Sequence, residues 1–174
     1  MAAHAVGERV WLPGRRVVRH TQDVHISART DYALRALLAL AASGTATVTG
    51  PVLAAEQGLP LKFLEAILAD LRRAGLIRTR RGAVGGYALA RSADLITVGE
   101  VVRAVDGPLA VIRGERPERA EYEGAAEHLQ ELWIALRAAL RIVLDEVTLA
   151  ELLSGELPER VRQLVAEPGA WTSR

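Results

Sequence analysis

The sequence contains no cysteine among its 174 residues. This absence excludes disulfide bonds, thiolate zinc sites, cysteine-held iron–sulfur clusters and a cysteine nucleophile. A chain of this length forms one domain or two small ones and buries about 70% of the surface of its unfolded state. We therefore expect a fold that needs no metal and no other cofactor to hold it together.

Long apolar runs are also missing. The longest uncharged stretch, residues 36–55, is interrupted by Ser43-Gly44-Thr45 and by Thr49-Gly50-Pro51, whereas a membrane-spanning helix needs about 20 mostly apolar residues. Residues 1–25 scatter four arginines and lack the apolar core of a signal peptide. We therefore predict a cytoplasmic protein without a membrane segment.

Lysine is almost absent, since Lys62 stands beside 21 arginines, and with 30 alanines this bias indicates a GC-rich genome. The distribution of charge is more informative. Residues 26–91 carry nine basic and four acidic residues, a net charge of +5, whereas residues 92–174 carry nine basic and fifteen acidic ones, a net charge of −6. This asymmetry favours an anionic partner for the first part, although charge alone leaves open that both parts are solvated surface.

Residues 27–75 have the pattern of three helices. They are expected to begin near Ser27, Thr49 and Pro60 and to end at Gly44, Gly58 and Gly75. Apolar residues recur at helical spacing in the first helix, at Leu34, Leu37, Leu38 and Ala41, and in the third, at Leu64, Ile67, Leu68 and Leu71. Two short strands, residues 76–81 and 86–90, follow around a glycine-rich loop.

Three helices followed by a hairpin is the order of a winged helix-turn-helix, a mainly α fold with a small β-wing. In that fold the third helix enters the major groove of DNA. Its face opposite the apolar one carries Lys62, Ala66, Ala69 and Arg73, with Glu65 beside them. An alanine methyl can meet a thymine methyl, and a glutamate can accept a hydrogen bond from cytosine N4.

The wing and the helix starts add further candidates for DNA contact. Arg78, Arg80 and Arg81 precede the wing loop and suit the narrow minor groove of A·T-rich DNA. Arg29 and the helix N-termini at Ser27 and Thr49 suit phosphates. Winged helices also serve as protein-docking modules, so that alternative stays open. Gly85-Gly86 could indicate a phosphate-binding loop, but the strand-to-helix context and the following Lys-Ser/Thr are missing.

The second half of the sequence predicts another group of helices. Thr97–Glu100 and Thr148–Glu151 are capping boxes, and a polar loop spans residues 113–124. A long helix is expected over residues 125–147, and the tail after Gly155 is expected to be loosely ordered. The long helix carries an apolar face: Leu129, Leu132, Trp133, Leu136, Leu140 and Val143.

Several of these segments resemble the Rrf-two family of bacterial repressors, which includes an iron–sulfur regulator, a nitric-oxide sensor and a regulator of cysteine metabolism. The resemblance covers residues 26–155 and is carried by residues 26–34, 71–77, 81–90, 96–102, 132–133 and 147–152, of which the Arg-Gly-x-x-Gly-Gly-Tyr wing at 81–87 is the most specific. It implies a homodimer that binds a palindromic operator in double-stranded DNA. It also implies that the apolar face of the long helix is the dimer interface, that Lys62 and Glu65 face the major groove, and that Arg81 enters the minor groove.

The resemblance fails at the sensing loop. Cluster-binding members carry three cysteines in the loop before the dimer helix, but here Glu127 stands near the last cysteine and Gln130 near the fourth ligand. The resemblance therefore implies a member without a cluster, whose protein or small-molecule effector is unknown. His128 is expected to be a solvated surface residue, and Trp133 to belong to the core or to an interface.

Four segments follow from these patterns. Residues 26–92 are the expected DNA-binding domain, residues 93–155 hold a linker helix, the sensor-type loop and the dimerisation helix, and residues 156–174 form a tail. Residues 1–25 are a basic arm, or the start is misplaced and residues 1–23 are an upstream extension before initiation at Val24. An enzyme is the least favoured class, because the four histidines are scattered and no Ser-His-Asp pattern or HExxH site is present.

Overall fold

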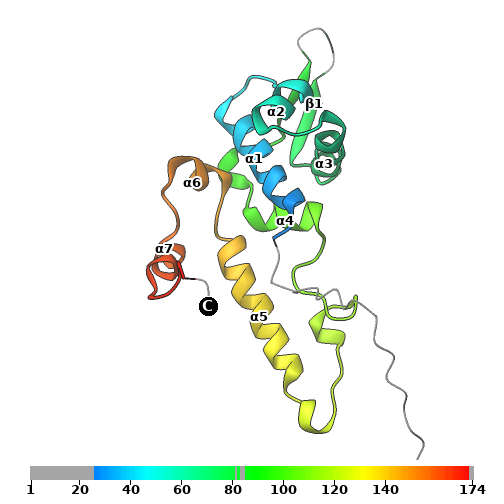
Figure 1. Ribbon diagram of the computed structural model, residues 1–174, viewed down its shortest axis with the longest axis vertical. Helices are drawn as coiled ribbons and strands as arrows, with labels where there is room; N and C mark the ends of the chain where they lie inside the picture. The colour runs from blue at the N-terminus through cyan, green and yellow to red at the C-terminus, as the bar shows by residue number, and fades with distance from the viewer. Residues whose placement is uncertain (1–25, 81, 83–84, 173–174) are drawn as a thin grey trace, which may run out of the picture.

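Residues 26–172, except for residues 81, 83 and 84, are described in the computed structural model of the chain. The described part is elongated, with a helix-and-hairpin unit at one end and a long helix running away from it (Figure 1). The unit contains α1 (Ala28–Ala42), α2 (Gly50–Gln57), α3 (Leu61–Arg73), β1 (Ile77–Arg80), β2 (Gly86–Leu89) and α4 (Val98–Val105). The rest contains α5 (Leu129–Leu144), α6 (Leu149–Ser154) and α7 (Glu159–Ala166), with three 3-10 turns, η1 (Ala93–Leu95), η2 (Pro117–Arg119) and η3 (Gly124–Ala126).

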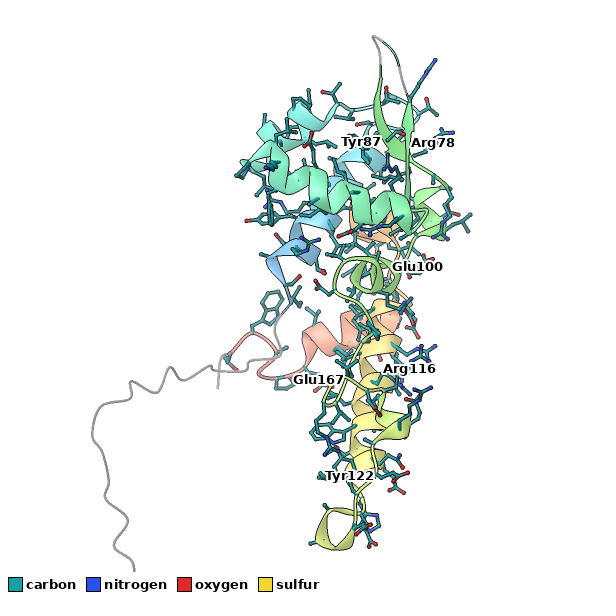
Figure 2. All side chains as sticks on the ribbon, turned by 90° about the vertical axis from the view of Figure 1, so that its right-hand side faces the viewer. Arg78, Tyr87, Glu100, Arg116, Tyr122 and Glu167 are labelled. Atoms are coloured by element: carbon teal, nitrogen blue, oxygen red, sulfur yellow. The ribbon has the colours of Figure 1, made fainter. Side chains whose placement is uncertain are left out.

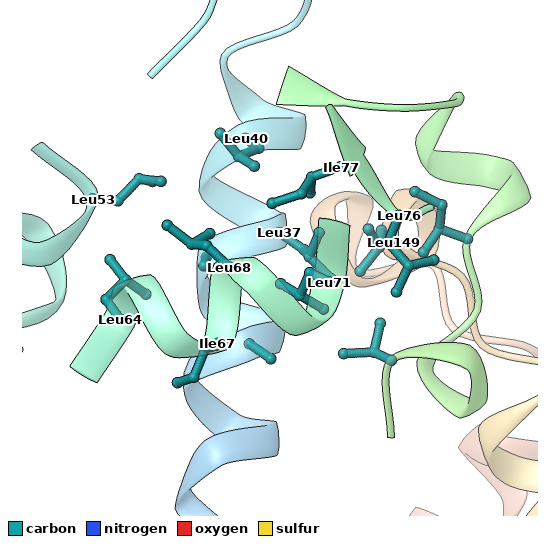
Figure 3. Packing of buried hydrophobic residues seen from close by; sticks show 14 of the residues in the cluster. Leu37, Leu40, Leu53, Leu64, Ile67, Leu68, Leu71, Leu76, Ile77 and Leu149 are labelled. Carbon is teal, nitrogen blue, oxygen red and sulfur yellow. The ribbon is translucent and has the colours of Figure 1, made fainter. Parts of the chain in front are cut away.

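The first unit is the winged helix-turn-helix that the sequence predicts. Gly58 ends α2 in the left-handed conformation, with φ of 64°, and α3 follows after Leu59 and Pro60. The four apolar residues predicted for the core face of α3 are at most 1% exposed: Leu64, Ile67, Leu68 and Leu71. Figure 3 shows them packed against α1.

The buried face of α1 is shifted by one residue position from the face that its sequence pattern indicated. Leu37 is fully buried as expected, but Leu34, Leu38 and Ala41 are only partly buried. The fully buried apolar residues are Ala33, Ala36, Leu37 and Leu40, which themselves recur at i, i+3, i+4 and i+7. The helix contacts α2, α3 and β2, and also α4 and α6, and this packing decides which of the two neighbouring stripes is covered.

The wing is an antiparallel hairpin whose register runs from Ile77 opposite Leu89 to Arg80 opposite Gly86. Its second strand is tied to the connection between α1 and α2 close to the loop end of the hairpin. The Val48 amide donates to the Tyr87 carbonyl at 2.9 Å, and the Tyr87 amide donates to the Val48 carbonyl at 2.8 Å. The hairpin is therefore fixed to the helices through β2, one residue from its last pair, Arg80–Gly86.

Both predicted capping boxes are confirmed. Thr97 and Glu100 cap α4, and Thr148 and Glu151 cap α6. The two caps lie side by side, because the Val98 amide donates to the Val147 carbonyl at 2.8 Å. Leu149 of α6 is fully buried in the same core as α1 and α3. The chain thus returns to the first unit after α5.

Two expectations for the C-terminal part were wrong. The helix expected over residues 125–147 spans only Leu129–Leu144, because residues 124–126 form the turn η3 and Asp145 is the C-cap. The tail is not loose throughout: residues 159–166 form α7, and Val161 packs against Val98 and Val147. Among the described residues, no helix is long and apolar enough to cross a membrane.

Candidate nucleic-acid interface

The face of α3 that points away from the core is fully available to a partner. Lys62, Glu65, Ala66, Ala69 and Arg73 are all exposed, as the helical spacing predicted. Because the two alanine side chains are short, the middle of this face can approach another surface closely. Lys62 makes no ion pair within the part of the chain that the structure describes.

The C-terminal end of α3 is organised by Asp70. The Arg29 guanidinium lies 2.5 Å from Asp70 Oδ2, and Arg73 is paired with Asp70 Oδ1. Asp70 is 18% exposed, whereas Arg73 is 76% exposed. Arg29 and Arg73, both predicted to contact DNA, therefore lie next to each other, with one carboxylate offsetting part of their charge.

The beginnings of α2 and α3 and the wing come together around Gly50. A Cβ at position 50 would stand 3.4 Å from the Leu61 side chain and 3.6 Å from the Tyr87 ring. Thr49, which precedes Gly50, is exposed and its hydroxyl does not cap α2. The predicted phosphate site at Thr49 thus lies beside both the first turn of α3 and the wing.

The wing presents a cationic hollow. Arg78 and Arg80 are exposed on β1, and they line a cavity of about 290 Å³ together with Thr45, Thr47 and Thr79. Guanidinium and hydroxyl groups are common donors to phosphate oxygens. Sequence reasoning missed Thr45 and Thr47, because only the pairing of Val48 with the wing brings them there. Arg81 lies outside the described residues, so its minor-groove contact stays a prediction.

Gly85 and Gly86 are glycines for reasons of packing. A Cβ on Gly85 would stand 2.6 Å from the Arg80 carbonyl oxygen, and one on Gly86 would stand 2.7 Å from the Val48 carbonyl oxygen. Real Cβ contacts are essentially never below 3.0 Å. These glycines therefore allow the tight hairpin and its attachment to the helices, and they form no phosphate-binding loop between a strand and a helix.

Ser27 lies elsewhere. Its Oγ accepts from the Thr30 amide at 3.0 Å, which caps α1, and donates to the Asp106 carboxylate at 2.7 Å. Thr30 Oγ1 donates to the same carboxylate at 2.7 Å. The start of α1 thus faces an acidic group at the end of α4, away from the wing (Figure 1). The Ser27 hydroxyl is thus engaged by the α1 cap and by Asp106, although Arg29, another predicted DNA contact, lies two residues further along in the first turn of α1.

The sensor-type loop is fastened to α5 by side chains that lie one turn apart. Gln130 Nε2 donates to the Ala120 and Glu118 carbonyls at 2.9 Å and 3.2 Å. Trp133 Nε1 donates to the Tyr122 hydroxyl at 3.1 Å, and an Arg137 guanidinium N–H donates to Glu118 at 2.5 Å. Figure 2 shows Tyr122 beside α5, at the opposite end of the molecule from Arg78 and Tyr87 of the wing.

The ion pair between Arg137 and Glu118 adds to the attachment of the loop to α5. The hydrogen bond from Arg137 lowers the pKa of Glu118 to about 2, and the same bond raises the pKa of Arg137. His128, at the start of α5, is 80% exposed beside Glu127 and Glu131, as expected for a solvated residue.

This geometry is that of a winged helix-turn-helix, and the family and relatives that match the chain are DNA-binding regulators of transcription and not enzymes. More particularly, the chain belongs to the Rrf2 (Rrf-two) family, whose sequence pattern matches residues 26–155 and which is described as iron-dependent transcriptional regulators.

Relatives from bacteria support this assignment. The chain is 47% identical over 143 residues to Rv1287 of Mycobacterium tuberculosis, named as an HTH-type transcriptional regulator, covering 81% of this chain and 88% of that protein. It is 35% identical over 133 residues to the HTH-type transcriptional regulator CymR of Bacillus subtilis, covering 74% and 89%.

Solved structures agree. The structure of B. subtilis CymR, described as the global cysteine regulator, matches with a TM-score of 0.60 at 34% identity, over 75% of this chain and 97% of that one. The structure of T. potens IscR matches with a TM-score of 0.61 at 32% identity, over 76% and 88%.

The family description names iron, but the residues of this chain do not fit an iron centre of the cysteine-held kind. The sequence has no cysteine. Within the described residues, no group of three or more histidine, aspartate and glutamate side chains is placed to hold a metal ion. Near the expected fourth ligand position, Gln130 donates its amide N–H groups to the Glu118 and Ala120 carbonyls.

Proposed function

We propose that the chain is a homodimeric repressor that binds a palindromic operator without an iron–sulfur cluster. The observation that carries this proposal is the exposed outer face of α3, with Lys62 and Glu65 beside the start of α2 and the arginines of the wing. Lys62, Arg78 and Arg80 would hold phosphates, while Glu65 and Ala66 would meet base edges. A regulator of this kind acts on the chromosome, which places it in the cytoplasm.

The surface of α5 supports the dimer. None of its 16 residues is buried in the single chain, and Leu132, Ile134 and Leu136 are 55%, 37% and 40% exposed. An apolar hollow of about 520 Å³ adjoins the helix and is lined by four residues of the proposed interface: Leu129, Trp133, Leu136 and Leu140. Contiguous exposed apolar surface of this kind is typical of an interface.

The fastened loop supports the absence of a cluster. The family resemblance implies that this loop carries the cysteine ligands in relatives that hold a cluster. Here Gln130, Trp133 and Arg137 instead join the loop to α5 by hydrogen bonds. We expect protein purified without air to contain no acid-labile sulfide and to bind its operator equally well after treatment with an iron chelator. A visible iron–sulfur absorption band would contradict this part of the proposal.

The DNA contact is tested by the salt dependence of binding. We expect Arg80→Ala to weaken binding to a footprinted operator and to lower the slope of log K against log salt by about 0.9, because one phosphate contact is lost. Arg162→Ala is the matched control, since Arg162 is 62% exposed on α7 and far from the wing in sequence and fold. Equal slopes for the two variants would remove Arg80 from the interface.

A second candidate function is a module that docks a partner protein on its acidic half. The observation that favours it is the net charge of −6 over residues 92–174. A purified chain that forms no salt-sensitive complex with DNA, while its winged helix is intact by circular dichroism, would favour this candidate over the repressor.

A further inference from the structure

A charged cavity of about 290 Å³ lies between the end of α4, the turn η2 and α5, within the acidic half of the chain. Six of its lining residues are ionisable: Arg103, Arg116, Glu118, Arg137, Arg141 and Asp145. Four guanidinium groups thus face two carboxylates. The cavity is cationic although the surrounding part of the chain, residues 92–174, has a net charge of −6.

The four guanidinium groups are paired with the two carboxylates to different degrees. Arg137 is bonded to Glu118 at 2.5 Å and Arg103 to Asp145 at 2.8 Å. Arg141 reaches Asp145 only through its Nε at 3.4 Å, so its two terminal nitrogens are not used in that contact.

Arg116 is exposed and makes no ion pair within the described part of the chain. Arg116 and Arg141 therefore keep guanidinium donors that face the cavity. Planar guanidinium groups of this kind bind carboxylates and phosphates in bidentate geometry.

We propose that this cavity binds a small organic anion, whose carboxylate or phosphate group is held by Arg116 and Arg141. The carbon skeleton of the anion packs against Pro108 and Leu109, which form the apolar part of the wall. The cavity has about ten times the volume that one water molecule occupies in the liquid. That space suits the charged end of an anion of about ten non-hydrogen atoms.

An effect on DNA binding rests on the repressor function proposed above. Asp145 lies so close to α4 that a Cβ on Gly99 would collide with its carboxylate. The helix α4 in turn packs against α1 and α3. An anion that draws Arg141 away from Asp145 changes how α5 is held on the DNA-binding unit. We expect operator affinity to shift about fivefold or more when the cavity is filled.

The experiment is isothermal titration calorimetry on the full chain without DNA, with succinate and inorganic phosphate as separate probes. We expect saturable binding of at least one probe, weakened tenfold or more in Arg116→Gln and in Arg141→Gln and unchanged in Arg162→Gln. The probe that binds tells carboxylate from phosphate recognition. Arg116 makes no ion pair in the described residues, so its variant is expected to fold normally, which circular dichroism checks.

Two results would overturn the proposal. One is the absence of saturable binding for both probes. The other is binding that Arg116→Gln and Arg141→Gln leave unchanged but Arg80→Gln weakens, which would place the anion on the DNA-binding face. Because calorimetry needs no DNA, failure of the repressor function leaves this result intact, and a fivefold shift in operator affinity is tested separately at a saturating concentration of the probe.

Discussion

Gly86 is a residue at which backbone packing leaves no room for a side chain. The Val48 carbonyl oxygen would stand 2.7 Å from any Cβ at this position. That carbonyl cannot move away freely, because it accepts the Tyr87 amide at 2.8 Å. The same contact holds the wing against the helices. A side chain at position 86 would therefore disturb the placement of the wing arginines.

We therefore expect Gly86→Ala to lower the free energy of unfolding by about 1–3 kcal/mol, as overpacking usually does. Urea denaturation measures this difference in the free energy of unfolding. Gly50→Ala is the control, because its Cβ would make ordinary contacts with side chains at 3.4 Å and 3.6 Å, and we expect it to be close to the parent protein. Equal stability of all three proteins would mean that the wing is not attached as described.

Single residues also show what the sequence could and could not predict. The four core positions of α3 and the caps at Thr97 and Thr148 follow from spacing within one segment, and all are confirmed. Asp70, which joins Arg29 to Arg73, was missed, and Gln130 was noted only for its place near the fourth ligand, not as the residue that holds the sensor-type loop. Their partners lie 41 and 10 residues away, in positions that only the tertiary fold determines.

The sensor-type loop and α5 are joined into one structural unit by side-chain hydrogen bonds. Gln130, Trp133 and Arg137 project from the same side of the helix and each bonds a different part of the loop. The predicted helix began too early because its first residues, 124–126, fold as the turn η3 that closes this loop. Capping signals marked the beginnings of α4 and α6, but no such signal separates η3 from α5.

The bond between Glu118 and Arg137 predicts a pH dependence. Arg137 lowers the pKa of Glu118 from 4.5 to about 2. The folded state therefore binds fewer protons than the unfolded state, and the bond stabilises the fold above pH 4.5 and loses its effect as the pH falls toward 2. We expect Glu118→Gln to be less stable than the parent protein at neutral pH, with a difference that shrinks below about pH 4.5.

Urea denaturation of both proteins between about pH 7 and pH 3 measures this difference. Glu156→Gln is the matched control, since Glu156 is exposed and makes no ion pair among the described residues. A difference between parent and Glu118→Gln that stays constant over this range would show that the bond does not form in solution.

The two ends of the described part differ in charge and in exposed apolar surface. The winged helix-turn-helix carries the excess of positive charge. The helix α5 extends from it with none of its residues fully buried, although Val143 and Leu144 pack partly against Val98 and Val147. The sequence indicated this division through its charge and through the six apolar positions of the long helix. It did not predict α7, because that short helix is held by the packing of Val161 against Val98 and Val147.

If the chain dimerises through α5 as we propose, we expect Leu132→Glu to be a monomer, because a charge would be buried at the centre of the proposed interface. Leu164→Glu on α7 is the matched control, since Leu164 and Leu132 are 49% and 55% exposed in the single chain. Sedimentation equilibrium measures the mass of each. If Leu132→Glu remained a dimer with unchanged affinity, the interface would have to lie elsewhere.

We propose that the outer face of α3 and the wing read a two-fold symmetric DNA sequence. Selection of binding sites from random-sequence duplexes by the purified chain tests this proposal. We predict enrichment of one palindromic motif, weaker binding to all sequences for Lys62→Ala, and relaxed preference at one position of each half-site for Glu65→Ala. Enrichment of no motif, or a motif whose selection is unaffected by both variants, would contradict the account.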